Sequence, residues 1–511
     1  MPPLAALLVA MLAALLSAGI AAGADGDDGD GDPRTVLRLT PAQATALAAR
    51  GGELSLPALT ELPPDVAEAL AGHAGPLLDL GGLHALSSEA AEKLARHQGR
   101  LRLGGLRRLS ADAARQLART DGHVELPGLE SLTPEAATQL ARRLSFGLSV
   151  GLQTLDPQVA AALATATNDL ALPRLAALTP ATATALARHA GGTLRLDGLT
   201  TLDADVAQAL AAHGGFALDL PGVKTLTPAA AAALASLRGQ LRLTGLESLA
   251  PAAAEALAGH LGDLGLALPE IPADTAAALA KHRGDLHLAL KTLESRPLAA
   301  KLARQRSPGL TTLTSLSVEA ARELARREAD LDLSGLRRLP AGVAGELAAC
   351  KVGIRLEGLE SVTAADLAAL GTARVYLDGR ILATSDDETR AALLAQRTLH
   401  FDYRHLTTLT PEIARAIVAR EKRLDLAGIT SFAFPQVVEV AAVLARFPGP
   451  LALPGLKSIS ANALSALIRK EDVEIPLLET LEIMPEPDGV PSEDIVVPPG
   501  FAERQERRRN R

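Results

Sequence analysis

Residues 194–214 read LRLDGLTTLDADVAQALAAHG and contain almost one full copy of a repeated pattern. The stretch begins with the triplet L-R-L, in which apolar and polar residues alternate as in a strand with one buried face. Gly198 and Leu199 follow, and Ala207, Leu210 and Ala211 then recur at helical spacing. A short strand, a turn and a short helix are therefore expected within about 23 residues.

The same pattern recurs along the chain, with the consensus L-x-L-x-G-L-x-x-L-[ST]-P-x-x-A-x-x-L-A-x-H-x-G. Most copies are spaced by 22 to 24 residues, as shown by a marker residue at Leu59, Leu83, Leu106, Leu129, Leu152, Leu175, Leu199, Val223, Leu246, Leu268, Leu290, Leu313, Leu336, Leu359, Leu382, Leu406, Ile429, Leu456 and Leu478. These positions correspond to about nineteen stacked units.

Several copies carry a helix-start signal. Thr133-Pro134-Glu135 and Thr227-Pro228 place a capping hydroxyl before a proline that suits the first helical position. One strand–helix coil cannot bury its own leucines, so neighbouring coils must cover them. The sequence predicts an α/β, right-handed solenoid, with a parallel β-sheet on one face and short helices on the other.

Over roughly residues 36–483 the chain resembles the leucine-rich-repeat family, particularly its short bacterial variants. The resemblance rests on the L-x-L strand, the further leucines at fixed offsets and the repeat length. Where the common family pattern has Asn after L-x-L, this chain has a Gly-Leu pair, as at Gly198-Leu199 and Gly245-Leu246. The resemblance implies binding of a protein or a glycan, usually on the concave sheet.

Composition limits the possible classes of function. Aromatic residues make up 2% of the chain, and the formal net charge of -8 is spread along it without a basic stripe. Nucleic acid is therefore not expected as a partner. The single cysteine, Cys350, excludes an intramolecular disulfide framework, and we expect it to be buried as a small hydrophobe. No cofactor is expected.

The two ends of the chain differ from the repeats. Residues 1–24 contain an apolar, uncharged run followed by Ala22-Gly23-Ala24, which is typical of a cleaved signal peptide, with an uncleaved anchor as the alternative. Residues 25–35 form an acidic linker, and residues 484–511 are Pro-rich and then basic, so we expect disorder there. The signal predicts a secreted, periplasmic or cell-envelope protein.

Two patterns could carry chemistry. Residues 147–151 match the G-x-S-x-G nucleophile elbow, but they fall in the strand slot of a repeat, so we do not expect Ser149 to be catalytic. Histidines close several helices, at His73, His97, His189, His213, His260 and His282. We expect a helix-end role favoured by the helix dipole, with a metal site between adjacent coils as the alternative.

The middle residue of each L-x-L triplet should point out of the sheet. These residues alternate in charge from coil to coil: Asp79, Arg102 and Glu125, then Arg195, Asp219 and Arg242, then Asp332 and Arg355. Opposite charges on neighbouring strands favour the pairing, so this row is either a structural ladder, a recognition surface or both. From Tyr376 the alternation stops, and we expect Tyr376 to stand beside the unpaired acids Asp402 and Asp425. Arg355, Tyr376, Asp402 and Asp425 are therefore the candidate partner site, because aromatic residues are enriched at binding hot spots; aromatic filler in an irregular repeat is the alternative.

The sequence thus predicts a non-enzymatic, extracytoplasmic repeat scaffold that binds a protein or polysaccharide through its sheet face and is monomeric. The alternative is a structural spacer of the cell envelope that associates with copies of itself. An exposed apolar patch on the helix side would favour the spacer, whereas unusual residues on the sheet would favour capture of a partner. An enzyme would need a cluster of acid, base and nucleophile that interrupts the repeat, and we find none in the sequence.

Overall fold

The computed structural model of the chain describes residues 33–142, 147–431, 436–486, 491–492 and 494–509. The expected signal peptide, residues 1–24, and residues 25–32 of the acidic linker lie outside the described residues. The chain divides into two compact units, Met1–Gly151 and Leu152–Arg511, and each is described by itself.

The first unit repeats strand and helix five times. Its strands β1 to β5 pair in parallel in sequence order, and the leading helix α2 precedes β1. The elements are α2 (Pro41–Ala48), β1 (Leu54–Ser55), α3 (Pro64–Ala71), β2 (Leu77–Asp79), α4 (Ser88–Leu94), β3 (Arg100–Arg102), α5 (Ala111–Leu117), β4 (Val124–Leu126), α6 (Pro134–Ala141) and β5 (Leu148–Val150).

The first part of the second unit continues the same alternation. Strands β6 to β11 pair in parallel, each with the next along the chain. The elements are α7 (Pro157–Leu163), β6 (Leu170–Ala171), α8 (Pro180–Leu186), β7 (Thr193–Arg195), α9 (Ala204–Leu210), β8 (Ala217–Asp219), α10 (Pro228–Leu234), β9 (Gln240–Leu243), α11 (Pro251–Leu257), β10 (Leu264–Leu266), α12 (Ala273–Leu279) and β11 (Leu286–Leu288).

The second part of this unit is less regular and forms shorter sheets, β12-β13, β14-β15-β16-β17, β18-β19-β21 and β20-β22. Its elements are β12 (Thr292–Leu293), α13 (Arg296–Ala303), β13 (Ser315–Leu316), α14 (Val318–Leu324), β14 (Leu331–Asp332), α15 (Val343–Leu347), β15 (Ile354–Arg355), α16 (Ala364–Leu370), β16 (Val375–Asp378), α17 (Ile381–Thr384), α18 (Asp387–Ala395), β17 (Leu399–Asp402), α19 (Pro411–Arg420), β18 (Leu424–Asp425), α20 (Val437–Ala445), β19 (Leu451–Ala452), β20 (Ser458–Ser460), α21 (Ala461–Ile468), β21 (Val473–Glu474), β22 (Glu482–Met484) and α22 (Pro499–Arg509).

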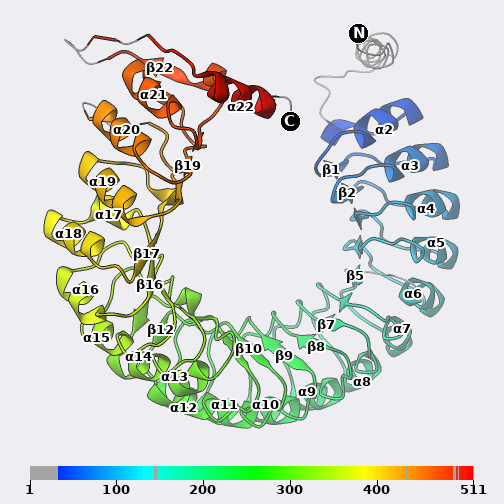
Figure 1. Ribbon diagram of the computed structural model, residues 1–511. Coiled ribbons are helices and arrows are strands. Elements are labelled where there is room, and N and C mark those ends of the chain that lie inside the picture. The colour runs from blue at the N-terminus through cyan, green and yellow to red at the C-terminus, as the bar shows by residue number, and fades with distance from the viewer. Residues whose placement is uncertain (1–32, 143–146, 432–435, 487–490, 493, 510–511) are drawn as a thin grey trace. The chain divides into compact units, whose positions relative to one another are not determined.

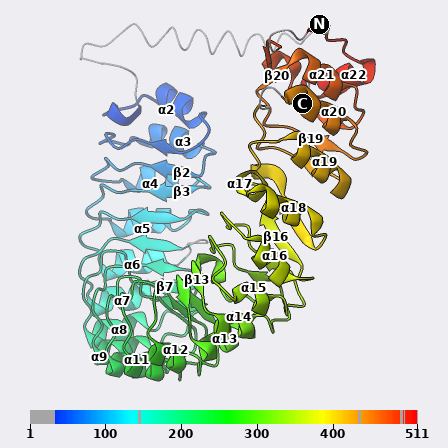
Figure 2. The same ribbon diagram turned by 90° about the vertical axis from the view of Figure 1, so that its left-hand side faces the viewer.

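Within the second unit, the strands lie on one side of the coils and the helices on the other, so sheet and helices form two layers (Figure 1). Figure 2 shows the successive helices of this unit stacked beside one another as a single outer layer. This arrangement confirms the predicted α/β solenoid, in which each coil is covered by its neighbours.

Burial in each coil follows the sequence pattern. In the coil of β9, Leu241, Leu243 and Leu246 are almost fully buried, and Ala253 and Leu257 of the following helix face them with no exposed area. Each leucine removed from water contributes roughly 1.5–3 kcal/mol. The small alanines let the helix approach its strand closely, and the neighbouring coils supply the remaining contacts.

The helix starts are also as predicted. The Thr227 hydroxyl accepts a hydrogen bond from the backbone N–H of Ala230 at 3.2 Å, and Pro228 opens the helix. The hydroxyl thereby satisfies one of the backbone donors left free in a first helical turn. The chain is thus directed from strand to helix at this residue in the coils whose cap side chain makes such a bond.

The glycine of the Gly-Leu pair allows adjacent coils to stack. A Cβ atom placed on Gly245 would lie 1.8 Å from the carbonyl oxygen of Pro221 in the preceding coil. No larger residue can take this position without moving the backbone. Close backbone approach therefore explains the glycine of the Gly-Leu pair in this coil.

The C-terminal segment contains a helix where we expected disorder. Phe501 of α22 is 2% exposed, and Gln505 donates to the carbonyl oxygen of Pro476 at 3.2 Å. Arg508 donates to the carbonyl oxygen of Ile475 and forms a 2.6 Å ion pair with Glu474. An apolar anchor and backbone contacts to the last coil hold this helix, as is usual for a terminal cap of a repeat array.

Among the residues that the structure describes, no helix has the length and apolar character needed to cross a bilayer.

Candidate binding surface on the sheet face

The alternating charges stand in register on neighbouring strands. In the first unit Asp79 is opposite Arg102, and the Arg102 guanidinium lies 3.7 Å from the Glu125 carboxylate. In the second unit Arg195 is opposite Asp219, with 3.5 Å between their charged groups. Burial raises the pKa of Asp219, while the charges of Arg195 and Arg242 oppose that rise. The predicted charge ladder is present on both stretches of sheet.

On the sheet of β14 to β17 the outward row changes character. Asp332, Arg355, Tyr376 and His400 are aligned on successive strands. The Arg355 guanidinium lies over the Tyr376 ring at 5.9 Å from its centroid. The His400 ring, on the next strand, stacks on the Tyr376 ring with 5.1 Å between the two centroids. We call Arg355, Tyr376 and His400 the aromatic row.

A glycine makes room for the ring of Tyr376. A Cβ on Gly353, at the start of the neighbouring strand, would lie 2.7 Å from Cε2 of that ring. Tyr376 is therefore held between a backbone without a side chain, a guanidinium and an imidazole. Aromatic stacking and the cation–π contact each contribute on the order of 0.5–1.5 kcal/mol. The ring is thus already ordered before any partner arrives.

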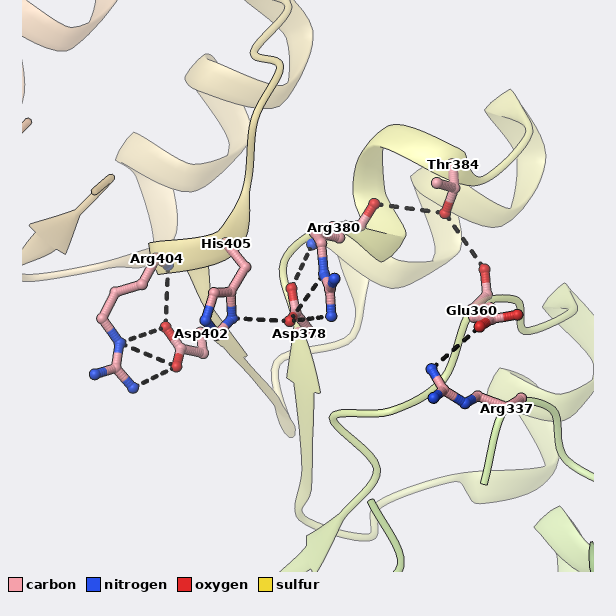
Figure 3. A network of polar contacts seen from close by, with 8 residues as sticks. All are labelled: Arg337, Glu360, Asp378, Arg380, Thr384, Asp402, Arg404 and His405. Atoms are coloured by element: carbon pink, nitrogen blue, oxygen red, sulfur yellow. Dashed lines mark hydrogen bonds and ion pairs between the residues drawn. The ribbon is translucent and has the colours of Figure 1, made fainter. Parts of the chain in front are cut away.

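Beside the aromatic row, a buried carboxylate organises a polar network (Figure 3). Asp378 is 5% exposed. It accepts hydrogen bonds from the backbone N–H of Arg380 at 2.9 Å and from Nε of Arg380 at 3.1 Å. Nδ1 of His405 lies 3.0 Å from the same carboxylate. Charge-assisted bonds of this kind fix geometry, so Arg380 and His405 present their exposed parts at defined positions.

Asp402 does not stand where we expected it. In the register of β16 and β17 it is opposite Asp378, and His400 is the residue opposite Tyr376. It is also paired: Nε and Nη2 of Arg404 donate to its carboxylate at 3.0 and 2.6 Å. The pKa of Asp402 is lowered, and the hydrogen bonds from Arg404 are the largest cause. The expectation of an unpaired Asp402 beside Tyr376 is wrong, because the outward triplet of this coil is L-H-F and not F-D-Y.

Asp425 belongs to a different sheet. It lies on β18, opposite Ala452 of β19, whereas Tyr376 lies in the sheet of β14 to β17. The charge of Asp425 nevertheless acts on Arg404, whose pKa is raised first by the hydrogen bond to Asp402 and further by Asp425. The structure thus brings together Arg355 and Tyr376 from the predicted set. Asp402 and Asp425 instead both act on Arg404.

Sequence reasoning missed Asp378, Arg380, His400 and His405. A signal was present, because Asp and Arg recur two residues apart in Asp378-Gly379-Arg380 and Asp402-Tyr403-Arg404. Both acids bond the guanidinium two residues later. An exposed ion pair, Arg337 with Glu360 at 3.1 Å, marks the edge of the network in Figure 3.

The recurring histidines are buried at 0 to 3% exposure and lie in pairs on adjacent coils, His73 with His97, His189 with His213, and His260 with His282. The rings of His73, His189 and His282 contact carbonyl oxygens of the preceding coil, as Nε2 of His282 does with Gly262 at 3.0 Å. Nδ1 of His213 instead accepts a hydrogen bond from the backbone N–H of Gly215 at 3.1 Å. Desolvation lowers the pKa of His213 to about 4, with the charge of His189 as a second cause. The helix-end position is confirmed. Burial lowers the pKa of five of these histidines, which disfavours the charged ring that the expected dipole role needs; the five are His97, His189, His213, His260 and His282.

Three further sequence features have simple places. Within the described residues, no group of three or more His, Cys, Asp or Glu side chains could hold a metal ion. Ser149 lies in β5 opposite Glu125, in the strand slot of its repeat. Cys350 is buried, as expected, and desolvation raises the pKa of its thiol. Such a thiol is a poor nucleophile.

Comparisons with known proteins concern the fold alone. No protein-family model matches the sequence, and no characterised protein matches it in sequence. A chain of the Drosophila Toll–Spatzle complex is similar over 84% of this chain and 59% of its own length, at 16% identity and a TM-score of 0.35. This chain therefore spans about three fifths of that protein's length.

Two further solved structures are similar at lower scores. An internalin from Listeria monocytogenes matches over 78% of this chain and 89% of its own, at 12% identity and a TM-score of 0.24. The leucine-rich-repeat ectodomain of an Arabidopsis thaliana membrane receptor kinase matches over 83% and 71%, at 13% identity and 0.21. The class of this protein rests on its own geometry: parallel L-x-L strands and short helices, repeated about every 23 residues, define a leucine-rich-repeat solenoid.

Proposed function

We propose that the protein is a non-enzymatic extracytoplasmic scaffold that binds a protein or polysaccharide partner through its sheet face, with the aromatic row as the central contact. The observation that carries this proposal is the ordered stack of Arg355, Tyr376 and His400 on the outward face of three paired strands. In a chain with 2% Phe, Trp and Tyr, one of the two tyrosines stands here, beside a histidine and outside the leucine core.

The physics of the row suits recognition. Arg355 and His400 are exposed, and Tyr376 is half-buried, so all three offer surface to a partner. Because the side chains are already held by one another and by Gly353, binding loses little side-chain freedom. Tyr and Arg are the residue types that most often dominate binding energy. The paired groups around them, Asp378 with Arg380 and Asp402 with Arg404, can form a polar rim.

The extracytoplasmic location is part of the proposal and rests on residues 1–24 of the sequence, which read as a signal peptide. The single cysteine agrees with a chain that does not depend on disulfides in an oxidising compartment.

The alternative of a self-associating spacer finds less support. Such a protein needs an apolar patch on its helix side. The large apolar side chains exposed in the described part of the chain are Leu37, Phe216, Leu261, Ile483 and Val496, and none of them lies in a helix. The described helices therefore expose no large apolar side chain, which favours a monomer that leaves its sheet face free.

The experiment is quantitative capture from an envelope extract by the immobilised protein, comparing wild type with the double variant Tyr376→Ala/His400→Ala. We expect the variant to capture at least about tenfold less partner than wild type, as for the loss of a hot-spot pair. The matched control, Arg322→Ala/Glu346→Ala, removes a 2.7 Å ion pair from the helix side of neighbouring coils. Equal capture by all three proteins would refute the aromatic row as the binding surface, and loss only in the control would move the site to the helices.

A further inference from the structure

The charge ladder on strands β8 to β11 has one position without a charge. Asp219 is opposite Arg242, Arg242 is opposite Gly265, and Gly265 is opposite His287. Alternation along this row would place an acid between Arg242 and His287. Instead, the row offers a basic residue on each side of a glycine.

The backbone does not require glycine at this position. A Cβ on Gly265 would meet only ordinary contacts, the nearest being Cγ of Arg242 at 3.4 Å. Gly245 differs, because a Cβ there would lie 1.8 Å from a carbonyl oxygen. The space above Gly265 is therefore room that a side chain could fill and does not.

That room belongs to a hollow of about 510 Å³ on the sheet face. The floor includes Gly265 and Leu288, and the walls carry the polar groups of Gln240, Thr244, Asp263 and Thr312, with Arg242 and His287 on either side of the glycine. Strands in a sheet lie about 4.8 Å apart, so the two flanking side chains start from positions about 10 Å from each other. A ligand group can enter between them.

The polar groups of the hollow are held but not fully used. Nη2 of Arg242 donates to Oε1 of Gln240 at 3.0 Å, and no carboxylate in the described residues forms an ion pair with Arg242 within 4.0 Å. The carboxylate of Asp263 accepts from Nε2 of Gln240 at 3.2 Å and from the backbone N–H of Asp285; its distance to Nε2 of His287 is 4.0 Å. Arg242 thus keeps donors for an incoming acid.

We propose that the hollow at Gly265 binds an acidic sugar unit of a polysaccharide, with the ligand carboxylate taking the missing acidic place between Arg242 and His287. Arginine and carboxylate form strong, often paired hydrogen bonds. The Thr244 and Thr312 hydroxyls, Gln240 and Asp263 provide partners for the sugar hydroxyls. The proposal deepens the proposed binding through the sheet face, but the hollow lies on other strands than the aromatic row, so either site can fail its test while the other stands.

The walls favour a sugar acid over an acidic peptide side chain. A carboxylate side chain carries acceptors only, whereas Asp263 and the threonine hydroxyls call for a ligand that also donates. Pockets with a few converging polar groups over a small apolar floor are typical of small polar ligands. The hollow is also several times larger than one carboxylate group needs.

The test is calorimetric titration of the full chain with a galacturonate trisaccharide, a neutral galactose trisaccharide and an acetylated tetraglutamate peptide. We expect saturable binding of the galacturonate alone. Arg242→Gln should weaken it at least about tenfold by removing the charge-assisted contact. Gly265→Asp should abolish galacturonate binding, because the new carboxylate fills the missing place beside Arg242. The melting temperature of this variant should be equal to or above that of wild type.

The control is Arg195→Gln, which changes a residue of the same row that is already paired with Asp197 and Asp219 and should leave binding unchanged. Melting temperatures of all variants separate lost binding from lost folding. The proposal is overturned if galacturonate does not bind the wild type, if the neutral sugar or the peptide binds as tightly, or if Gly265→Asp binds like wild type.

Discussion

Two stretches of the second unit solve the same packing problem with different chemistry. After each helix, at an equivalent place in the repeat, stands one side chain that is largely buried; we call this place the helix-end position. From α8 to α12 this position holds His189, His213, His260 and His282, with Leu237 between them. From α13 onward the position holds Gln305, Arg327, Cys350, Arg420, Phe447 and Lys470, among others, and no histidine.

The arginines satisfy more carbonyl groups than the histidines do. The guanidinium of Arg327 is 4% exposed and donates to the carbonyl oxygens of Gln305 and Arg306, while its Nε donates to Asp330 at 3.1 Å. Nζ of Lys470 donates to Phe447 at 2.6 Å. A histidine such as His189 reaches one carbonyl oxygen, that of Asn168, at 2.7 Å. Carbonyl groups at and after a helix end need partners, and Arg327, Lys470 and His189 supply different numbers of them.

The difference lies in charge. Arginine keeps its charge at every accessible pH. Burial disfavours the charged form of an imidazole, because the charged ring loses its hydration. The histidine stretch is therefore sensitive to acid and the arginine stretch is not. The comparison teaches that one structural position can be equivalent in packing and different in its response to pH.

The largest expected effect is loss of stability on acidification. Burial lowers the pKa values of His189, His213, His260 and His282, that of His213 to about 4. Because the unfolded value is about 6.5, the unfolded chain binds more protons in this window, and stability falls as pH falls from about 6.5 to about 4. His213 alone should account for on the order of 3 kcal/mol. Urea unfolding at pH 7.5 and 4.5 measures the loss.

A variant sharpens that measurement. His213→Gln should unfold at a similar urea concentration to wild type at pH 7.5 and at a higher one at pH 4.5. His84→Gln changes an exposed histidine outside the helix-end position and should follow wild type at both values. Parallel pH profiles of wild type and His213→Gln would contradict the assignment.

Removing an arginine from the second stretch should come next in size. Arg327→Met keeps much of the side-chain volume but leaves several carbonyl oxygens without a donor, so we expect a loss of about 2–4 kcal/mol that does not change between pH 7.5 and 4.5. Arg304→Met, at an exposed position near the same helix end, should cost less than about 0.5 kcal/mol. A loss confined to low pH would show that the arginine does not act as a permanent charge.

The smallest effect is expected from placing a histidine at a helix-end position of the second stretch. Gln305 is 5% exposed and donates weakly to the carbonyl oxygen of Leu286 at 3.5 Å. Gln305→His should be within about 1 kcal/mol of wild type at pH 7.5 and lose roughly 1–2 kcal/mol more at pH 4.5, because a buried imidazole beside Arg327 resists protonation. Thermal unfolding at the two pH values is sufficient, and an unchanged pH difference would mean that the site is open to water.

Much of the fold could be predicted because the same sequence pattern recurs from coil to coil. The triplet L-R-L at Leu241 and the cap at Thr227 need only local rules, and stacking follows because no other surface can bury the leucines. The helix at Pro499–Arg509 was not predicted, because its composition is polar and the anchor is one phenylalanine, Phe501. Composition alone does not show that a single apolar residue finds a pocket.

Less of the candidate site could be predicted. Tyr376 and Arg355 stand in regular triplets, and the structure aligns them as the periodicity implies. The error at Asp402 arose because Leu399-His400-Phe401 and the following Phe401-Asp402-Tyr403 both alternate, and the choice between them is fixed only by pairing with β16. The buried pairs of histidines depend on distances between coils, which spacing in the sequence does not provide.

The most direct test of the comparison is amide hydrogen exchange resolved by coil, with rates corrected for intrinsic exchange, at pH 7.5 and pH 5.0. We predict that protection of the coils carrying His189 to His282 falls at pH 5.0 while that of the coils carrying Arg327 to Lys470 is kept. Equal loss in both stretches, or loss confined to the arginine coils, would contradict the account.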